Sequence, residues 1–370
     1  MIETIEFYKD LLDNSIDFFA GVPDSLLANF CACIKTNSPR ERNVITANEG
    51  NAVAMAAGYH LSTGKIGCVY MQNSGEGNAV NPLLSLADED VYSIPMLLVI
   101  GWRGEPGKHD EPQHVKQGKV TCSLLDAMGI GYVVLSDDYQ KELQTAISYM
   151  KEKRRPYALV IKKDLFSPYK IPKEDSPYPL TREDALQEIL AGLTEEDIVV
   201  STTGKTSREI FEIREANGQG HSNDFLTVGS MGHTASIAYG VAIGTDKDVW
   251  CIDGDGSFLM HMGSLGVIGA NLPANFKYIL NDNNAHESVG GQPTCTKSLD
   301  VPTILKACGF ADVVVAETKA EIRAGIARLK AEKGVAMVLH TRQGSRANLG
   351  RPTTTPQENK NALMKKLGVQ

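Results

Sequence analysis

Two apolar runs in the second half of the chain decide the fold: Val249-Trp-Cys-Ile-Asp-Gly-Asp-Gly-Ser257 and Tyr278-Ile-Leu-Asn-Asp-Asn-Asn284. Each run is short, rich in apolar residues and closed by oxygen-bearing side chains. This pattern is typical of a buried parallel strand that leads into a functional loop. Asp255 and Asn283 stand 28 residues apart. Both would lie at strand ends of an open α/β sheet, where such sheets bind their ligands.

These two residues are predicted ligands of a magnesium ion. Mg²⁺ takes about six oxygen ligands, and few of them come from the protein when a phosphate group supplies the rest. The Asp255 carboxylate, the Asn283 side-chain oxygen and the backbone carbonyl of Ala285 would leave the other positions to a diphosphate and water. Asp282 is the alternative to Asn283, because residues 281–284 all carry side-chain oxygens.

The residues around Asp255 also fit an anionic group. Gly254 and Gly256 would let the backbone approach a diphosphate, and a helix beginning at Ser257 would present its free N–H groups to it. An ordinary strand-to-helix turn is the alternative interpretation of Gly-Asp-Gly by itself. Together with the strand that ends at Asn283, the motif resembles the cofactor site of thiamine diphosphate (ThDP) enzymes. That resemblance implies ThDP and Mg²⁺ as cofactors.

A second motif lies in the first half of the chain, where Glu49 opens a helical stretch of mostly small, apolar residues, 50–58. Apolar surroundings raise the pKa of a carboxyl group. By resemblance to ThDP enzymes, Glu49 bonds N1′ of the aminopyrimidine and shares a proton with it, so that the cofactor becomes its own base. The alternative is a Glu that merely complements the helix dipole. Gly75 and Asn78, in the segment 72–78, are further expected cofactor contacts.

The glycine-rich segment 227–233 resembles the stretch that bends ThDP into its V-shaped conformation. The resemblance implies that the Gly229 carbonyl accepts a hydrogen bond from the 4′-amino group and that Met231 is the apolar wedge between the two rings. A methionine that simply fills the core is the alternative. Further expected cofactor contacts in this half are Ser230, Thr203 and Gly204.

Composition excludes several classes of protein. The chain has 370 residues, 42% of them hydrophobic and 22% charged, which is typical of a globular protein. A net charge of −8 argues against a general nucleic-acid binder. No apolar run reaches about 18 residues, so we expect no membrane span. The N-terminus lacks a signal-peptide pattern, and the seven cysteines are odd in number and scattered, so we expect reduced thiols and a cytoplasmic protein.

Strand-like and helix-like runs alternate along the chain, which predicts an α/β protein with two doubly wound parallel sheets. The predicted domains are 1–165 (pyrimidine-binding), a Pro-rich linker at 166–180, and 181–370 (pyrophosphate- and Mg-binding), with no central third domain. The predicted strands are 18–22, 43–46, 66–71, 95–101 and 157–162, then 198–202, 225–228, 249–252, 277–280, 312–315 and 336–341. The predicted helices are 25–34, 50–62, 80–88, 139–152 and one capped at Thr181.

The chain as a whole resembles the phosphonopyruvate decarboxylases, with sulfopyruvate decarboxylases as the nearest relatives. The most specific segments are 21–25, 72–78, 101–114, 202–209, 285–293 and 344–352. The resemblance implies non-oxidative decarboxylation of 3-phosphonopyruvate to phosphonoacetaldehyde and CO₂ through a ThDP enamine, in phosphonate (2-aminoethylphosphonate) biosynthesis. It also implies a homodimer or higher homo-oligomer, with each cofactor between the pyrimidine domain of one subunit and the pyrophosphate domain of another.

The charge of such a substrate agrees with the residues. A phosphonated 2-oxo acid is a small anion with several charges and needs cations and oriented N–H donors. Arg103 and Lys108 crowd the loop after the strand 95–101, and Arg346 and Arg351 lie in a glycine-punctuated segment near the C-terminus. We expect Arg103, Lys108 or Arg346 to contact the substrate. Solvated surface charge is the alternative for any of them.

Asp24 matches the Asp that related 2-oxo acid decarboxylases hold near the reacting carbon, where it helps protonate the enamine after CO₂ leaves. His109 or His114 is the expected relay partner, because imidazole suits acid–base chemistry near neutral pH. Asp24 could also cap the following helix.

Two other phosphate-binding motifs are incomplete. Gly204-Lys205-Thr206 resembles the end of a P-loop, but Val199 stands where that motif needs glycine. The Gly75-Glu-Gly77 segment lacks the third glycine of a dinucleotide fingerprint.

Overall fold

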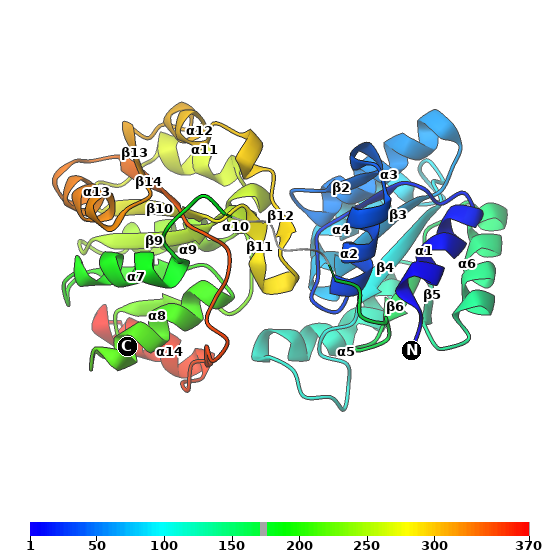
Figure 1. The fold of residues 1–370 in the computed structure, drawn as a ribbon, viewed down its shortest axis with the longest axis horizontal. Helices are drawn as coiled ribbons and strands as arrows, with labels where there is room; N and C mark the ends of the chain where they lie inside the picture. Colours follow the sequence, from blue (N-terminus) through cyan, green and yellow to red (C-terminus); the bar gives the residue numbers. More distant parts are fainter. Residues whose placement is uncertain (171–175, 370) are drawn as a thin grey trace. The chain divides into compact units, whose positions relative to one another are not determined.

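The computed structural model describes residues 1–170 and 176–369, and these divide into two compact units, Met1–Lys173 and Glu174–Gln370. The division falls within the linker predicted at 166–180, of which residues 171–175 lie outside the described part of the chain. Each unit contains a six-stranded sheet in which all neighbouring strands are parallel (Figure 1). Two doubly wound parallel sheets are therefore confirmed.

Unit 1 carries helices on both faces of its sheet (Figure 1). Its strands are β1 (Phe19–Gly21), β2 (Asn43–Ile45), β3 (Gly67–Gln72), β4 (Met96–Gly101), β5 (Gly131–Val134) and β6 (Tyr157–Ile161). Its helices are α1 (Thr4–Asp13), α2 (Ala28–Asn37), α3 (Glu49–Thr63), α4 (Glu76–Pro82), α5 (Pro112–Ala127) and α6 (Tyr139–Lys153), with short helical turns at Arg40–Arg42, Asn73–Gly75 and Leu83–Ala87.

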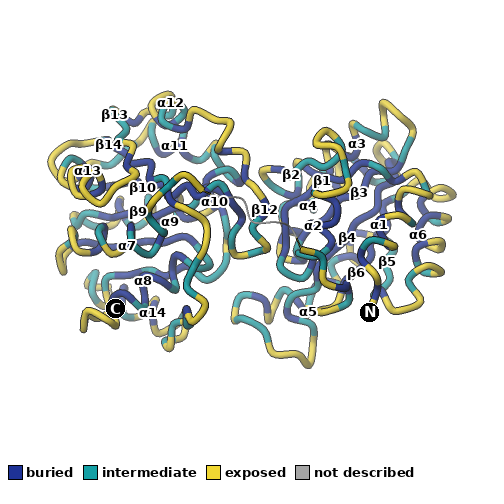
Figure 2. The backbone as a smooth tube through the Cα atoms, viewed as in Figure 1, coloured by how far each residue is buried: buried dark blue, intermediate teal, exposed yellow. Residues whose placement is uncertain are grey.

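Alternate residues of the same strands build two cores in unit 1. In β4, Leu97 and Val99 pack with residues of α1, α2 and α6, whereas Leu98 and Ile100 pack with α3, α4 and α5. Successive side chains of a strand point to opposite faces, so both faces of this sheet are apolar. The strands are dark blue along most of their length in Figure 2, in agreement with a sheet buried between helical layers.

Unit 2 has the same architecture. Its sheet strands are β7 (Ile198–Ser201), β8 (Asp224–Leu226), β9 (Val249–Gly254), β10 (Phe276–Asp282), β13 (Asp312–Ala316) and β14 (Val335–His340), and a hairpin is formed by β11 (Ala285–His286) and β12 (Gln292–Pro293). Its helices are α7 (Arg182–Ala191), α8 (Lys205–Ala216), α9 (Thr234–Ala242), α10 (Asp255–Met260), α11 (Gly263–Ala270), α12 (Val301–Ala307), α13 (Lys319–Ala331) and α14 (Pro356–Lys366), with 3₁₀ turns at Glu287–Val289 and Thr296–Ser298.

The two sheets share one strand order, although their sequences show no repeat. Unit 1 runs β2-β1-β3-β4-β6-β5, and unit 2 runs β8-β7-β9-β10-β14-β13. In each sheet the second strand pairs with one side of the first strand, and the third strand pairs with its other side. Ligands of open α/β sheets bind at the carboxyl ends of the strands beside such a switch point. The residues after β1 and β3, and those after β7 and β9, occupy these positions.

Every predicted strand corresponds to a strand in the structure, within two or three residues at either end. Three helical predictions need correction. The helix predicted at 80–88 begins earlier, at Glu76, and changes to a π-helical turn at Leu83. The helix predicted from Ser257 begins at Asp255 and breaks at His261 before α11. Asp24 does not cap α2, whose N-cap is Leu27.

Two further observations concern the described ranges. No helix among them is long and apolar enough to cross a membrane. All seven cysteines lie in these ranges, and all are free thiols.

Candidate active site

Asp24 lies just after β1 and is completely buried. Its Oδ1 accepts a hydrogen bond from the Gln72 side chain at 2.7 Å, and its Oδ2 accepts from the Leu26 N–H at 2.9 Å. A Cβ on Gly101 would come within 2.2 Å of Oδ2, so glycine is required there. Burial raises the pKa of Asp24 although Gln72 and the Arg103 charge act to lower it. This carboxyl can therefore hold a proton more readily than an exposed aspartate.

Glu49 begins α3, and its N-cap Asn48 accepts a hydrogen bond from the Asn51 N–H at 3.0 Å. The Glu49 side chain is buried, and its Oε2 accepts from the Asn78 amide at 2.7 Å. A Cβ on Gly75 would lie 2.3 Å from Oε1, so only glycine leaves room for the carboxyl group. Burial raises the pKa of Glu49, and the Asn78 hydrogen bond opposes that rise. The structure thus brings three predicted residues together around one buried carboxyl.

The loop after β4 holds the predicted cations of unit 1. Arg103 donates through Nε to Asp110 Oδ2 at 2.8 Å, makes a second contact with Asp110 through Nη2, and donates through Nη1 to Ser25 at 2.8 Å. Burial acts to raise the pKa of Asp110, but the hydrogen bonds from Arg103 and from two backbone N–H groups, together with the Arg103 charge, hold that pKa well below its usual range. Lys108 is exposed. Arg103 is therefore a fixed cation whose charge is partly neutralised by Asp110.

The two candidate histidines have different surroundings. His109 is exposed in the loop, whereas His114 is buried in the first turn of α5. Burial, reinforced by the Arg103 charge, lowers the pKa of His114 to about 4, so His114 is neutral at physiological pH. Its Nδ1 has no hydrogen-bond partner among the described residues.

The predicted metal ligands of unit 2 converge on one backbone donor. The Ala285 N–H is 2.9 Å from Asp255 Oδ2 and 3.1 Å from Asn283 Oδ1. Asp255 also accepts from Thr294 Oγ1 at 2.7 Å and from the Gly256 N–H at 2.9 Å. Burial, and after it the Asp282 charge, raise the pKa of Asp255. A cation at this position would offset both effects.

Asp282 points its carboxylate elsewhere. Its Oδ1 accepts from the backbone N–H of Asn284 at 3.0 Å, from the Asn284 side chain at 2.7 Å and from Thr296 Oγ1 at 2.8 Å. Asn284 has φ 55°, a left-handed conformation that Asn tolerates better than most residues. Because three donors already engage Asp282 Oδ1, Asn283 is the better candidate for the ligand.

The predicted diphosphate and wedge segments reach the same edge of the unit 2 sheet. Gly204, with φ 93°, precedes α8 at the end of β7, and a Cβ on Gly254 at the end of β9 would lie 3.5 Å from Thr202. Met231 lies over Gly256, since a Cβ there would be 3.2 Å from the Met231 Cε. Ser257 accepts a hydrogen bond from the Gly232 N–H at 3.1 Å. Within the described ranges, the Thr203 side chain makes no hydrogen bond to another residue.

Arg346 is engaged by acidic side chains. Its Nε lies 2.9 Å from Glu183 Oε1, and its Nη2 forms an ion pair with Glu212. These contacts make Arg346 a weaker substrate candidate than Arg103, because two carboxylates already balance its charge. Arg351 is exposed.

Two sequence comparisons report on the family. Residues 7–128 match the thiamine pyrophosphate enzyme N-terminal TPP binding domain, and residues 202–340 match the corresponding C-terminal TPP binding domain. The chain belongs to the thiamine pyrophosphate enzyme family. It is 34% identical to a phosphonopyruvate decarboxylase of Streptomyces viridochromogenes, with 97% of this chain and 93% of the relative aligned.

Two further relatives align over most of the chain. A phosphonopyruvate decarboxylase of Streptomyces hygroscopicus is 33% identical, over 97% of this chain and 92% of the relative. A sulfopyruvate decarboxylase of Methanosarcina acetivorans is 27% identical, over 91% of this chain and 89% of the relative. The predicted resemblance is thus confirmed at the level of the family.

The residues present fit the family's cofactor and a divalent cation. Asp255 and Asn283 each place one oxygen at the Ala285 N–H. Glycine is required at 256, because a Cβ there would lie 2.8 Å from His286 Nδ1. In unit 1, Glu49 offers a buried carboxyl of raised pKa, as an exchangeable proton on a ring nitrogen requires.

Sequence reasoning missed three polar residues near these groups. Glu76 follows Gly75, and burial raises its pKa to about 8; its Oε1 has no partner in the described chain. Gln292 is buried on the β11–β12 hairpin, and neither side-chain polar atom finds a described partner. Glu287 binds Asn283. All three lie in segments that carry the family resemblance, Glu76 in 72–78 and the other two in 285–293, but none of them was singled out.

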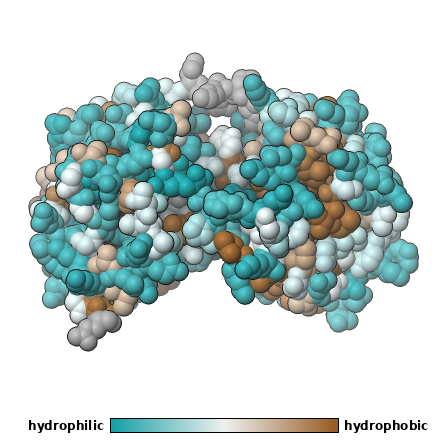
Figure 3. Space-filling view, turned by 90° about the horizontal axis from the view of Figure 1, so that it is seen from below, coloured by the Kyte–Doolittle hydropathy of each residue, from teal (hydrophilic) through white to brown (hydrophobic). Residues whose placement is uncertain are grey.

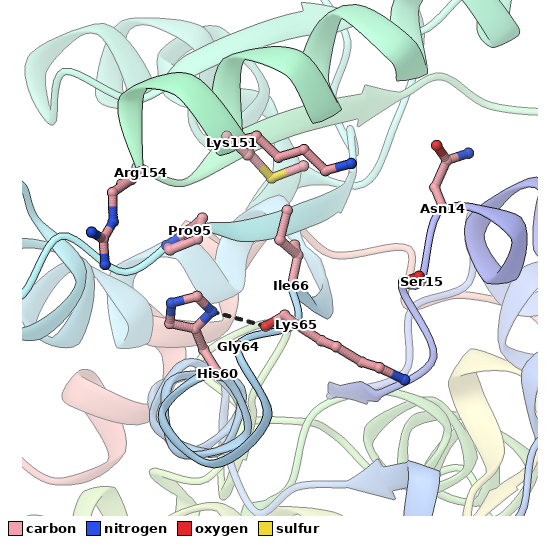
Figure 4. Close-up of a pocket in the computed structure, with 10 residues that line it drawn as sticks. Asn14, Ser15, His60, Gly64, Lys65, Ile66, Pro95, Lys151 and Arg154 are labelled. Atoms are coloured by element: carbon pink, nitrogen blue, oxygen red, sulfur yellow. Dashed lines mark hydrogen bonds between the residues drawn. The ribbon is translucent and has the colours of Figure 1, made fainter.

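A cavity of about 530 Å³ in unit 1 lies at the opposite edge of the sheet, where β3 and β4 begin (Figure 4). Ile66 and Pro95 line it together with the cations Lys65, Lys151 and Arg154. Lys151 and Arg154 stand at the C-terminal end of α6, where a cation complements the helix dipole. The cavity is therefore separate from the residues discussed above.

Proposed function

We propose that this protein decarboxylates phosphonopyruvate to phosphonoacetaldehyde and CO₂, using ThDP and Mg²⁺. The observation that carries the proposal is the 34% identity to a phosphonopyruvate decarboxylase over 97% of the chain. The alternative substrate is sulfopyruvate. It is supported by the lower identity of 27% to a sulfopyruvate decarboxylase over 91% of the chain. Both are small anionic 2-oxo acids.

In this proposal, Asp255, Asn283 and the backbone carbonyl of Ala285 hold the magnesium ion. The shared donor of the two side chains supports this set, and the hydrogen bonds that Asp282 makes to Asn284 and Thr296 support Asn283 over Asp282. Oxygen ligands of this kind suit Mg²⁺ when a diphosphate completes the coordination. The diphosphate contacts are assigned to Thr203, Gly204, Gly254, Gly256 and Ser257.

Bound ThDP supplies a nucleophilic thiazolium carbon and an electron sink for the decarboxylation. Glu49 holds a proton at its buried carboxyl and exchanges it with N1′ of the pyrimidine. Asn78 and Gly75 fix the orientation of that carboxyl. The Gly229 carbonyl, Ser230 and Met231 are assigned to the bend of the cofactor.

Substrate binding is assigned to the unit 1 loop. Arg103 offers a guanidinium held by Asp110, and Lys108 adds a mobile charge at the surface. A fixed guanidinium recognises phosphonate oxygens through paired N–H donors. Asp24, with its raised pKa, holds the proton that replaces CO₂ on the former keto carbon. His114, neutral and with an unpartnered Nδ1, is preferred over His109 as the relay.

We infer a homodimer or higher homo-oligomer with the cofactor between subunits. Several large apolar side chains are exposed on helices, among them Met55 and Leu61 on α3 and Val267 on α11. Figure 3 shows brown, apolar patches on a largely hydrophilic surface. Exposed apolar area of this kind favours association. Sedimentation of the purified protein at several concentrations measures the assembly.

The substrate is tested by steady-state decarboxylation of phosphonopyruvate, sulfopyruvate and pyruvate by the enzyme reconstituted with ThDP and Mg²⁺. We expect the highest kcat/KM for phosphonopyruvate. A higher value for sulfopyruvate would move the protein to the alternative. Absence of CO₂ release from all three would overturn the proposal.

A further inference from the structure

Glu287 joins three parts of unit 2 through one carboxylate, whose side chain is 10% exposed. Its Oε2 accepts from the Asn283 amide at 2.7 Å and from Arg182 Nη1 at 2.9 Å, and its Oε1 accepts from Lys205 Nζ at 3.1 Å. Arg182 belongs to α7, Lys205 begins α8, and Asn283 follows β10. The carboxylate thus ties two helices to the loop that carries the proposed metal ligand.

The contact with Glu287 determines which atom of the Asn283 amide is available to a cation. A carboxylate only accepts hydrogen bonds, so the amide must present its NH₂ group to Glu287. The other end of the amide agrees, because Oδ1 lies 3.1 Å from the Ala285 N–H, a donor. Both neighbours select the same orientation. The oxygen is left on the side of Asp255, where the same Ala285 N–H meets Asp255 Oδ2 at 2.9 Å.

We propose that Glu287 is a positioning residue for the metal ion: it holds the Asn283 amide with its oxygen toward the cation, and Arg182 and Lys205 hold Glu287 in place. The inference rests on the proposed function, since it assumes that Asn283 is a metal ligand. Side chains behind metal ligands orient them in this way, and their loss typically weakens metal affinity about 10- to 100-fold.

The ion-pair partners of Glu287 show that it is not needed to neutralise Arg182. That guanidinium already makes two hydrogen bonds with Glu209, at 2.7 and 2.8 Å. Lys205 is more exposed than Arg182 and can be solvated. Asn283 is the partner whose amide orientation depends on the carboxylate.

The direct test measures binding of Mn²⁺ to the full-length protein in the presence of ThDP. The signal of free Mn²⁺ in electron paramagnetic resonance reports how much of the ion is bound. We expect Glu287→Ala to weaken Mn²⁺ binding about 10- to 100-fold. Glu188→Ala is the matched control, because Glu188 also accepts from two cations, Arg323 and Lys319, and its side chain is 12% exposed. The control should bind Mn²⁺ like the wild type. Equal affinities of Glu287→Ala and wild type would overturn the inference.

A second variant separates orientation from support of the fold. Asn283→Asp places a carboxylate 2.7 Å from that of Glu287, so it should weaken Mn²⁺ binding in the wild-type background in spite of its added charge. In the Glu287→Ala background the same change should strengthen binding, because a carboxylate presents an oxygen in either orientation. If Asn283→Asp weakens Mn²⁺ binding by the same factor in both backgrounds, Glu287 only supports the structure.

The same measurement distinguishes failure of this inference from failure of the proposed function. If the wild type binds Mn²⁺ with ThDP and Asn283→Ala abolishes that binding, the metal site stands and the Glu287 variants decide the inference. If the wild type shows no ThDP-dependent Mn²⁺ binding, the proposed function and the inference fall together. Melting temperatures of the apo variants show whether each one is folded.

Discussion

Asn78 donates its side-chain amide to Oε2 of Glu49 at 2.7 Å, and Glu49 is 4% exposed. Replacing Asn78 by Ala removes this bond and leaves the carboxylate with one fewer donor. A hydrogen bond to a charged group contributes about 1.5–3 kcal/mol. The pKa of Glu49 should therefore rise, and a loss of this size shifts the balance toward the protonated carboxyl by about 10- to 100-fold.

The sign of the effect follows from which form the bond stabilises. The amide stabilises the ionised carboxylate and so lowers the pKa, in opposition to burial, which raises it. In Asn78→Ala burial still raises the pKa, and only the weaker backbone hydrogen bond at Glu49 still opposes it. The ionised fraction of Glu49 at a given pH should fall, and the acid limb of the pH–rate profile should move to higher pH.

The assay is exchange of the C2 proton of bound ThDP for deuterium, measured against pH, with kcat/KM for decarboxylation in parallel. Glu49→Gln identifies the limb that belongs to Glu49, because that variant should lack it. Asn81→Ala is the matched control, since Asn81 lies exposed on the same helix and its side chain bonds only Ser85. An acid limb that stays in place in Asn78→Ala, or moves to lower pH, would refute the reasoning.

Four further predictions concern Gly75, Asp255, Arg103 and Arg346. Gly75→Ala should suppress proton exchange and decarboxylation, because its Cβ would meet Glu49 Oε1 at 2.3 Å, whereas Gly77→Ala, with nothing within 4 Å, should keep wild-type rates in the same assays. Asp255→Ala should lose bound ThDP in gel filtration, and wild type stripped by a chelator should regain activity only with ThDP and a divalent ion; full activity in excess chelator would contradict the metal site. Arg103→Gln should lower kcat/KM for phosphonopyruvate about 10- to 100-fold, for the loss of about 1.5–3 kcal/mol, and affect pyruvate much less. Arg346→Gln should instead lower the melting temperature and leave the ratio of the two substrates unchanged; equal losses on both substrates in Arg103→Gln would exclude a phosphonate contact.

The sheets could be predicted because their strands are buried on both faces. A run such as Met96–Gly101 is apolar at every position, and this signal survives without knowledge of the partners. The strand that was missed, Gly131–Val134, is half-buried at the sheet edge, although residues 130–135 also form a short apolar run. The helix from Asp255 also ended sooner than its composition indicated, because the turn at His261 interrupts it.

The sequence suggested candidate site residues but not their hydrogen-bond and ion-pair partners. The positions of Glu49 and Asp255 at helix starts after strands follow from local patterns and from the family resemblance. The preference for Asn283 over Asp282 as the proposed metal ligand rests on the hydrogen bonds that Asp282 makes with Asn284 and Thr296, which the sequence does not show. Arg346 became a weaker candidate for substrate binding because of its ion pair with Glu212, which lies 134 residues earlier in the chain.

The alternation of strands and helices and the two parallel sheets could be predicted from the amino-acid sequence, because these depend on apolar periodicity and short-range turn chemistry. The proposed cofactor-binding residues came from the family resemblance. Only the tertiary structure decided which donor meets which carboxylate. It placed Asn78 on Glu49, Gln72 on Asp24 and Glu287 on Asn283. Such contacts depend on burial and on the approach of elements that are distant in the chain, and the same geometry sets the pKa of each buried group.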